Sequence, residues 1–423
     1  MTSKPLVERD FFSDPSILRD PYQYFEAMHA KGPVNQLADR DLVLVTGFEE
    51  ALEVLRNTKD FSSVITAGGP VLPLPFEPQG SDISAQIEQH RSQVPGCDLL
   101  VTYDDSRHIS TRSLLSRLFV PSRLKANEEF MRVFAEKLVK EAVSKGQCEL
   151  IGEIAAPYVT LVVADLLGVP EEDRELFRKA IDAGPPAGST ESGGTSFAVL
   201  EYMAGFFVRY IEERRAHPRE DILTEFASAK YPDGSTPDVM ELVKLAVFLF
   251  AAGQDTSAKL IGNAMRFIVE SPALQNKLRE DRSLISAFLE EVLRLEGSTK
   301  TTFRLARRNT KIGSMDIPAG KKVVIAFAGA NRDSRRWQDP EEFKLDRPKI
   351  KEHIAFGRGA HTCIGAPLAR AEVAIIMDQF FANTSQIDLS QEKHGPPGSR
   401  RLDYEPSYII RGLLQMHLEL TPN

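Results

Sequence analysis

The chain has 423 residues, 42% of them hydrophobic and 26% charged, which is the composition of a globular protein with a large core. A formal net charge of -8 disfavours nucleic acid as a general partner. The longest purely apolar run, at 245–253, is far shorter than the roughly 20 residues needed to cross a bilayer, and no apolar targeting signal opens the sequence. We therefore expect a cytoplasmic protein with no nucleic acid and no membrane as partner, and a monomer.

The first part of the chain predicts a helix, a pair of strands and a second helix within residues 20–58. Residues 62–100 are rich in proline and lack periodicity, apart from a short helical pattern near 81–91. A loop of this length inside a compact domain is usually functional or disordered.

Helical patterns dominate residues 105–215, and a Gly- and Ser-rich stretch at 183–196 predicts a flexible connection within them. The clearest helix begins at Thr236-Pro237-Asp238, an N-cap followed by proline at the first helical position. It extends to about Glu270, roughly 50 Å at 1.5 Å per residue, and its apolar middle predicts that it crosses the centre of the fold. Two further helical stretches reach Arg294, and strand patterns follow at 311–320, 321–329 and 408–420.

Three cysteines, Cys97, Cys148 and Cys363, are too few and too scattered for a disulfide framework, and none forms a CxxC pair. For the first two, a buried thiol is the ordinary interpretation. Around Cys363, glycines at 357, 359 and 365 permit positive φ and a close approach of other groups to the backbone. A helical pattern follows, so backbone N–H groups and the helix dipole favour an anionic sulfur there.

The run Phe356-x-x-Gly359-x-His361-x-Cys363-x-Gly365 resembles the haem-binding loop of cytochromes P450. The resemblance implies haem b as cofactor, Cys363 as the metal ligand on the haem iron, and Phe356 packed beside the porphyrin.

The same resemblance implies a mainly α cytochrome P450 fold, a helix-rich single domain over 1–423 with small β-sheets and a long central helix crossing the haem face. The parts richer in strands are expected at about 33–60, 300–330 and 385–423, and the helical parts at about 105–300 and 364–383.

The long helix contains Ala252-Gly253-Gln254-Asp255-Thr256. A mid-helix glycine costs about 1 kcal/mol relative to alanine, and threonine can bond a carbonyl one turn earlier, so the helix can open here. Taken alone, the pattern also fits an ordinary polar pair facing solvent. It resembles the oxygen-activation motif of cytochromes P450, which implies a hydrogen-bonding role for Thr256, a proton-relay role for Asp255, and haem beside Ala252 and Gly253.

The two haem propionates need cations or hydrogen-bond donors. His108 and Arg112 are one helical turn apart and align with a family pair, Arg304 matches the family's strand arginine better than Arg307 does, and His353 is a further candidate. The resemblance thus implies a cofactor-binding set of His108, Arg112, Ala252, Gly253, Arg304, His353, Phe356, Gly357, His361, Cys363 and Gly365.

Glu291-x-x-Arg294 places opposite charges on one helix face, and such pairs are mostly surface features worth about 0.2 to 0.5 kcal/mol. Together with Arg347, however, the pair resembles the buried ion triad of the family. The resemblance implies a structural role for all three residues.

Family position implies that the long loop at 62–100, the region 170–210 and the turn 407–410 line the substrate pocket, together with Leu249, Phe250, Ala252, Ser298, Thr299 and Thr302. The loop is apolar and the stretch 298–302 more polar, which favours an apolar substrate with one polar group.

The resemblance implies a monooxygenase that inserts one atom of O2 into a small organic molecule. Electrons would come from NAD(P)H through a reductase and an iron-sulfur ferredoxin. Basic residues could attract an acidic ferredoxin, or they could simply be solvated surface residues. These residues are Arg107, Arg117, Arg123, Lys125, Arg358 and Arg370. A peroxide-dependent enzyme and a non-catalytic haem-thiolate sensor or carrier are the alternatives, and Asp255 with Thr256 disfavours both.

Overall fold

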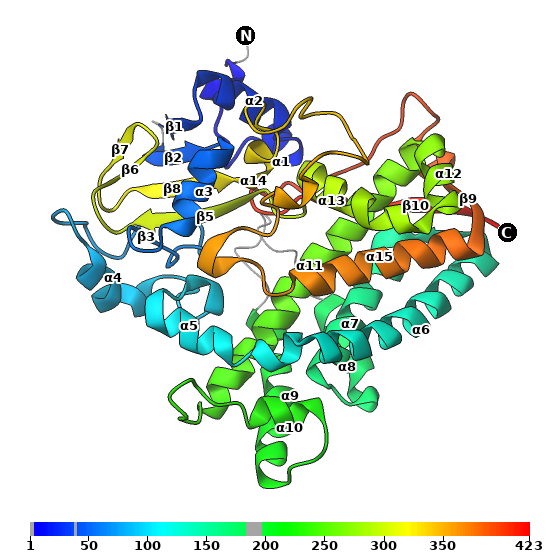
Figure 1. The fold of residues 1–423 in the computed structure, drawn as a ribbon, viewed down its shortest axis with the longest axis horizontal. Coiled ribbons are helices and arrows are strands. Elements are labelled where there is room, and N and C mark those ends of the chain that lie inside the picture. Colours follow the sequence, from blue (N-terminus) through cyan, green and yellow to red (C-terminus); the bar gives the residue numbers. More distant parts are fainter. Residues whose placement is uncertain (1–3, 38–39, 183–196) are drawn as a thin grey trace.

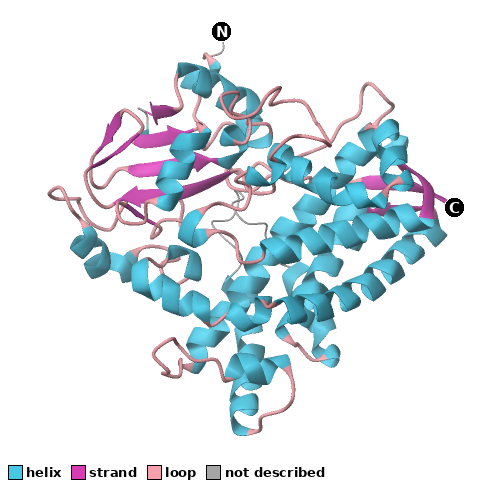
Figure 2. Cartoon of the chain, in the orientation of Figure 1, coloured by secondary structure: helices cyan, strands magenta, loops and turns pink. Residues whose placement is uncertain are grey.

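The computed structural model describes residues 4–37, 40–182 and 197–423. Helices fill most of the molecule, while a mixed sheet occupies one side and a small sheet lies at the opposite edge (Figures 1 and 2). The predicted mainly α fold with small sheets is confirmed. The stretch 183–196, for which we predicted a flexible connection, lies outside the described residues.

The helices occupy the following ranges: α1 (Pro15–Arg19), α2 (Tyr22–Lys31), α3 (Phe48–Arg56), α4 (Ser84–His90), α5 (Asp105–Ser113), α6 (Pro121–Lys145), α7 (Ala156–Leu167), α8 (Glu171–Asp182), α9 (Phe197–Ala216), α10 (Ile222–Ala227), α11 (Val239–Glu270), α12 (Pro272–Glu280), α13 (Ile285–Glu296), α14 (Phe327–Ala330), α15 (Ala366–Asn383) and α16 (Gln391–His394).

The strands form three sheets. The larger one has the order β1-β2-β8-β5-β3, and β2 runs parallel to β8. Four-residue β2 is buried at every position, as expected for an inner strand covered on both faces. The strand bounds are β1 (Val34–Leu37), β2 (Leu42–Val45), β3 (Phe61–Ser62), β4 (Gln147–Glu149), β5 (Thr301–Ala306), β6 (Thr310–Ile312), β7 (Met315–Ile317), β8 (Lys322–Ala326), β9 (Thr384–Leu389) and β10 (His417–Pro422).

The C-terminal strand differs from its prediction. The pattern at 408–420 becomes a strand only from His417 onward. Strand β10 lies between β4, which we did not predict, and β9, which falls in the strand-rich part expected at 385–423. Both depend on pairing with β10 for their backbone hydrogen bonds, so their existence is a tertiary effect.

Helix α11 crosses the middle of the molecule, as predicted (Figure 1), and packs against α7, α9, α13 and α15. It begins at Val239 with Asp238 as its N-cap, so the predicted cap at Thr236 is two residues early. The side chain of Asp238 makes no capping hydrogen bond. The stability of the helix therefore comes from burial of its apolar residues in the core.

One apolar stretch, Leu150–Leu167, is long enough to cross a membrane by length and composition, but 72% of it is buried inside the protein. It comprises a π-helical turn at Leu150–Ala155 and then α7, which packs against α11 and α6. This is the environment of a core helix. Among the described residues, no other helix passes the same test.

Candidate active site

The loop before α15 is a tight turn that presents Cys363. The Cys363 N–H donates to the Phe356 carbonyl at 2.9 Å, which closes the turn. Gly357 and Gly359 have φ of 67° and 79°, the left-handed region that favours glycine. A Cβ at Gly359 would lie 2.6 Å from the Leu55 carbonyl oxygen, so α3 also requires glycine at that position. The predicted reason for these glycines, a cramped backbone, is confirmed.

The Cys363 thiol combines two properties that rarely occur together. Its side chain is exposed, yet desolvation by burial raises its pKa. The thiol is therefore accessible and at the same time surrounded by many protein atoms. Hydrogen bonds from the Gly365 and Ala366 backbone N–H groups and the positive charge of Arg112 act in the opposite direction and lower the pKa. These groups are therefore ready to stabilise a sulfur anion.

A cluster of cationic and hydrogen-bonding side chains lies beside this loop. The rings of His108 on α5 and His361 are 4.0 Å apart, and His361 Nε2 lies 3.0 Å from Ser63 Oγ. Arg112 donates to the Thr362 carbonyl at 2.7 Å, one residue from the thiol. Arg304 on β5 is 4% exposed and donates to its neighbour's carbonyl, that of Phe303, at 2.7 Å.

The two arginines of this cluster carry positive charge, whereas burial lowers the pKa of His108 and so favours its neutral form. Burial lowers the pKa of Arg304 to about 10 and also lowers the pKa of Arg112. Burial and the neighbouring Arg304 lower the pKa of His361 to about 2. Within the described part of the chain, neither Arg112 nor Arg304 forms a salt bridge, and the buried Nε2 of His108 has no hydrogen-bond partner.

The side chains present therefore fit haem b. An accessible thiol beside backbone N–H donors suits an axial ligand, and buried donors that form no salt bridge within the described residues suit two propionates. Around Gly365 the space is open, because the nearest atom to a Cβ built there would be the Cys363 sulfur at 3.8 Å, an ordinary contact distance. The group would be held by Cys363 and by the donors His108, Arg112, Arg304 and His361.

On α11, the polar pair lies in a continuous helix rather than in an opened one. Thr256 Oγ1 donates to the Ala252 carbonyl at 2.8 Å, the backbonding predicted from the sequence. Ala252 is exposed although it lies at the middle of a helix that is otherwise buried in the core. Burial raises the pKa of Asp255, and its Oδ2 has no hydrogen-bond partner. This stretch thus combines an accessible helix surface with a carboxyl group able to hold a proton.

The predicted ion triad is present and buried. Glu291 contacts Arg294 through two hydrogen bonds of 2.9 and 2.8 Å, and Arg347 Nε reaches the same carboxylate at 2.8 Å. The two guanidinium groups also donate to backbone carbonyls of the segment 331–342, including Pro340 and Glu342. This network attaches α13 to the irregular chain that leads into the cysteine loop.

His353 lies elsewhere than the other predicted propionate partners. Its Nδ1 accepts from the Ala355 N–H at 3.2 Å, so its Nε2 donates to Glu290 at 3.0 Å. Burial would raise the pKa of Glu290, but hydrogen bonds from His353 and Arg370 outweigh it and hold the pKa at about 2. Arg370 in turn lies 4.7 Å above the Phe356 ring. His353 therefore connects the segment before the cysteine loop to Glu290 on α13.

The predicted pocket residues separate into two groups. Ala252, Thr299 and Thr302 retain accessible surface, and Leu249 and Ser298 keep a little. Phe250 has none, because its ring packs against Phe177 and Phe207 in the helical core. Its predicted place in the pocket wall is therefore wrong for this conformation.

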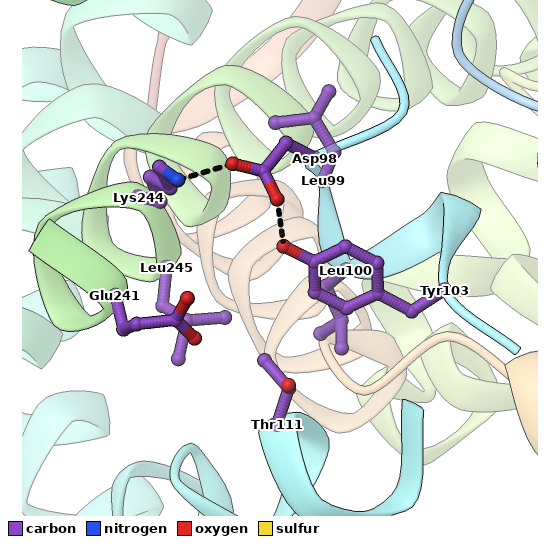
Figure 3. A pocket seen from close by; sticks show the side chains of 8 residues that line it. All are labelled: Asp98, Leu99, Leu100, Tyr103, Thr111, Glu241, Lys244 and Leu245. Carbon is purple, nitrogen blue, oxygen red and sulfur yellow. Dashed lines mark hydrogen bonds and ion pairs between the residues drawn. The ribbon is translucent and has the colours of Figure 1, made fainter. Parts of the chain in front are cut away.

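The long loop at 62–100 is attached to α11 by a polar contact (Figure 3). Asp98 forms an ion pair with Lys244. It also accepts hydrogen bonds from the Tyr103 hydroxyl at 2.8 Å and from Arg107 at 2.7 Å. A small pocket lined by Leu100, Tyr103 and Leu245 lies beside this contact. Opening the loop would require that Asp98 leave Lys244.

Several functional candidates carried no sequence signal. Glu372 on α15 is buried with both carboxylate oxygens unpartnered, and burial raises its pKa to about 8. Lys259 on α11 contacts Glu405 near the C-terminus. The sequence around a single charged residue in an apolar helix does not show which residue it pairs with. Lys259 pairs with Glu405, which is distant in sequence.

The fold and the site define a haem-thiolate protein, and comparison with known proteins agrees. The family model named Cytochrome P450 matches residues 190–395. Cytochrome P450 144 of Mycobacterium tuberculosis (strain ATCC 25618 / H37Rv) is 31% identical over 392 residues, which span 89% of this chain and 86% of that protein. The chain belongs to the cytochrome P450 family.

Further relatives and solved structures cover almost the whole chain. The Vitamin D(3) 25-hydroxylase of Pseudonocardia autotrophica is 27% identical over 432 residues, covering 100% of this chain and 99% of that one. Substrate-free CYP150A6 of Mycobacterium marinum has 46% identity and a TM-score of 0.93, over 99% of this chain and 100% of that one. CYP109E1 of Bacillus megaterium in complex with corticosterone has 26% identity and a TM-score of 0.80, over 96% and 99% of the two chains. This chain is accordingly a P450 monooxygenase that uses haem b.

Proposed function

We propose that this monooxygenase oxidises an apolar small molecule carrying one polar group, with electrons from NAD(P)H delivered by a reductase and a ferredoxin. The observation that carries the site is the exposed yet desolvated Cys363 thiol beside the unpaired cations Arg112 and Arg304. We propose Cys363 as the iron ligand, with His108, Arg112, Arg304 and His361 holding the propionates. Haem b, when bound, supplies the electron-transfer and O2 chemistry.

The chain's own residues then have separate tasks. Backbone N–H groups of Gly365 and Ala366 stabilise the sulfur anion. Asp255 holds and releases a proton at its free Oδ2, and the Thr256 hydroxyl, now bonded to the Ala252 carbonyl, can turn to pass that proton on. This pair is the reason to prefer oxygen-dependent turnover to a peroxide-driven reaction or to simple ligand binding.

The partner proposal rests on charge. Arg117 and Lys125 are exposed near the start of α6, the helix against which α15 packs. The other predicted basic residues are engaged: Arg123 with Asp165, Arg107 with Asp98, Arg370 with Glu290 and Arg358 with the Lys351 carbonyl. The two exposed residues are the ones we propose for attraction of an acidic ferredoxin in the cytoplasm.

The substrate proposal rests on the exposed pocket residues and on relatives. Thr299 and Thr302 can supply the polar contact, and Ala252 a flat apolar surface. Among the structurally similar proteins, CYP109E1 has been solved with corticosterone and with testosterone. We therefore place steroid-like molecules beside terpenoids and aromatic compounds in the set to be screened.

One experiment decides between the alternatives. Purified haem-loaded protein is first screened for compounds that shift the haem absorbance from the low-spin to the high-spin form. Each positive compound is then supplied with NADH, reductase and ferredoxin, or with hydrogen peroxide alone. Product formation coupled to NADH consumption is the expected result. Turnover with peroxide only would contradict ferredoxin dependence, and binding without product by either route would contradict the enzyme proposal.

A further inference from the structure

A single ammonium group, that of Lys259, lies between the buried carboxyl group of Glu405 and the carboxyl group of Asp255, whose side chain is 19% exposed. Its Nζ is 3.1 Å from Glu405 Oε2 and 4.0 Å from Asp255 Oδ1. The side chains of Lys259 and Glu405 are 7% and 1% exposed, so water cannot screen their charges effectively. Asp255 is one helical turn before Lys259 on α11, so the backbone holds these two at contact range.

The Lys259 side chain can take its course only because residue 412 is a glycine and has no side chain. A Cβ at Gly412 would lie 2.1, 2.5 and 2.6 Å from the Cδ, Cγ and Cβ atoms of Lys259. Gly412 does not have positive φ, so its backbone does not require glycine, and space for Lys259 is what requires it. The Lys259 side chain therefore passes through the space that a side chain at residue 412 would fill, and its ammonium group reaches Glu405.

The charges in this cluster do not balance. Besides Lys259, Lys300 is the cation that acts on Glu405, but burial lowers the pKa of Lys300 to about 7 and its amine donates to the Leu18 carbonyl at 2.7 Å. Burial raises the pKa of both Asp255 and Glu405, and Asp255 raises the pKa of Glu405 further. Two ionised carboxylates would thus share one close cation.

Glu405 lies two residues before the turn 407–410, which we predicted to line the substrate pocket. Its N–H donates to the Gly412 carbonyl at 3.0 Å. The turn that follows is bonded to the start of β5, where the Lys300 N–H donates to Ile409 at 2.7 Å and Thr301 Oγ1 to Tyr408 at 2.7 Å. A molecule that displaced this turn would move Glu405 with it.

We propose that Lys259 is a positioning residue whose ammonium group orients the Asp255 carboxyl group. In this proposal Glu405 weakens the contact between Lys259 and Asp255, because it competes for the same ammonium group. The inference deepens the proposed function, because it rests on Asp255 as the proton carrier. With Lys259 drawn to Glu405, as here, Asp255 Oδ2 stays free to exchange a proton. With Glu405 withdrawn, Lys259 closes on Asp255 and keeps it ionised.

The test uses opposite shifts in two variants of the haem-loaded protein. Glu405→Gln leaves Lys259 to Asp255 alone, so the pKa of Asp255 falls by about one unit or more. Lys259→Met removes the cation, so the pKa of Asp255 rises. The readout is the infrared carbonyl stretch of neutral carboxylic acids across a pH titration. The component lost in Asp255→Asn is assigned to Asp255.

The matched control is Asp403→Asn, which removes an exposed charge two residues before Glu405 and leaves the Asp255 signal in place. Gly412→Ala, which pushes Lys259 aside, behaves like Lys259→Met. If Lys259→Met does not fold, the near-isosteric Glu405→Gln variant still tests the proposal, because the direction in which the pKa of Asp255 shifts is enough to support or contradict it. Shifts in the same direction for both variants, or a Glu405→Gln titration equal to that of Asp403→Asn, would overturn the proposal.

Activity gives a second, separate readout. The pH dependence of turnover should move with the infrared titration in each variant. If Asp255→Asn turns over normally while the infrared shifts occur as expected, the proton-relay role in the proposed function fails and the Lys259–Glu405 competition stands. The failure of one is therefore distinguishable from the failure of the other.

Discussion

At the scale of single residues, the site is defined by charges that lack their counterpart. Arg304 is 4% exposed, and within the described part of the chain its hydrogen bonds go only to carbonyl and hydroxyl oxygens. A buried guanidinium without a carboxylate is costly unless an anion comes to it. Burial lowers the pKa of His108, and its buried Nε2 has no hydrogen-bond partner within the described residues. We interpret both as groups that await the haem propionates.

This interpretation predicts that Arg304→Leu weakens haem retention. A charge-assisted hydrogen bond contributes about 1.5 to 3 kcal/mol, so transfer of haem to an acceptor protein should be roughly tenfold faster or more. The matched control is Arg308→Leu, in which the side chain is 38% exposed and pairs with Asp82. Equal retention in the two variants would contradict a propionate role for Arg304.

Glu372 gives a prediction about pH. Burial raises its pKa to about 8 from an ordinary value near 4.5, so the folded protein binds a proton there that the unfolded chain releases. Wild-type stability should therefore fall as the pH rises from about 4.5 to 8, by at most about 1.4 kcal/mol per pKa unit of difference. Glu372→Gln should lack this dependence and be the more stable protein above pH 8.

The measurement is urea unfolding at several pH values, with the exposed Glu280→Gln as the control. A pH-independent difference between wild type and Glu372→Gln would show that the carboxyl is not neutral in the folded state. The nearby Ser257 hydroxyl, which lowers the pKa, would then be the stronger influence.

At the scale of elements, the triad of Glu291, Arg294 and Arg347 joins α13 to the chain before the cysteine loop. Arg347→Met would leave the buried Glu291 carboxylate short of one partner and would remove the three hydrogen bonds that Arg347 donates to backbone carbonyls of residues 338–342. Breaking a buried pair typically costs about 3 to 5 kcal/mol. We expect a loss of that order in the free energy of unfolding, together with loosened haem binding.

Arg282→Met is the control for this loss. Its partner Asp378 and Arg282 itself are each about one-third exposed, at 36% and 33%, and exposed pairs contribute about 0 to 1 kcal/mol. Thermal unfolding of the two variants side by side compares a buried with an exposed ion pair. Similar stabilities would mean that the triad is a consequence of the fold and contributes little to it.

Elements also show how far the sequence could predict the fold. Apolar periodicity predicted the helical regions that contain α6, α7 and α11. The first two helices end at Gly146 and Gly168, whose φ values of 71° and 75° favour glycine. The short strand β4 was not predictable, because it forms by pairing with β10, which is distant in sequence.

The site divides in the same way. Cys363, Gly359 and Thr256 lie in local motifs whose spacing carries chemistry, so their positions could be predicted. Lys259 and Glu405 meet only after the C-terminal segment folds back onto α11, and neither has a local pattern. His353 was assigned from its place near the loop, but its orientation depends on Glu290 of α13.

At the scale of the whole molecule, the sheet side and the helical side meet around the cysteine loop, and α11 crosses between them (Figure 1). Residues from α5, β5 and the loop before α15 contribute to one cationic cluster. An arrangement assembled from such separate parts of the chain indicates one large ligand that spans them. Haem b has the size and the charges for this role.

The reduced carbon monoxide complex of the purified, haem-loaded protein tests this central claim most directly. A thiolate ligand from Cys363 predicts the red-shifted absorbance band that distinguishes thiolate-bound haem. Cys363→Ser should lose the band and the oxygenase activity, while Cys97→Ser keeps both. A wild-type spectrum without the red-shifted band, or native turnover in Cys363→Ser, would contradict the account.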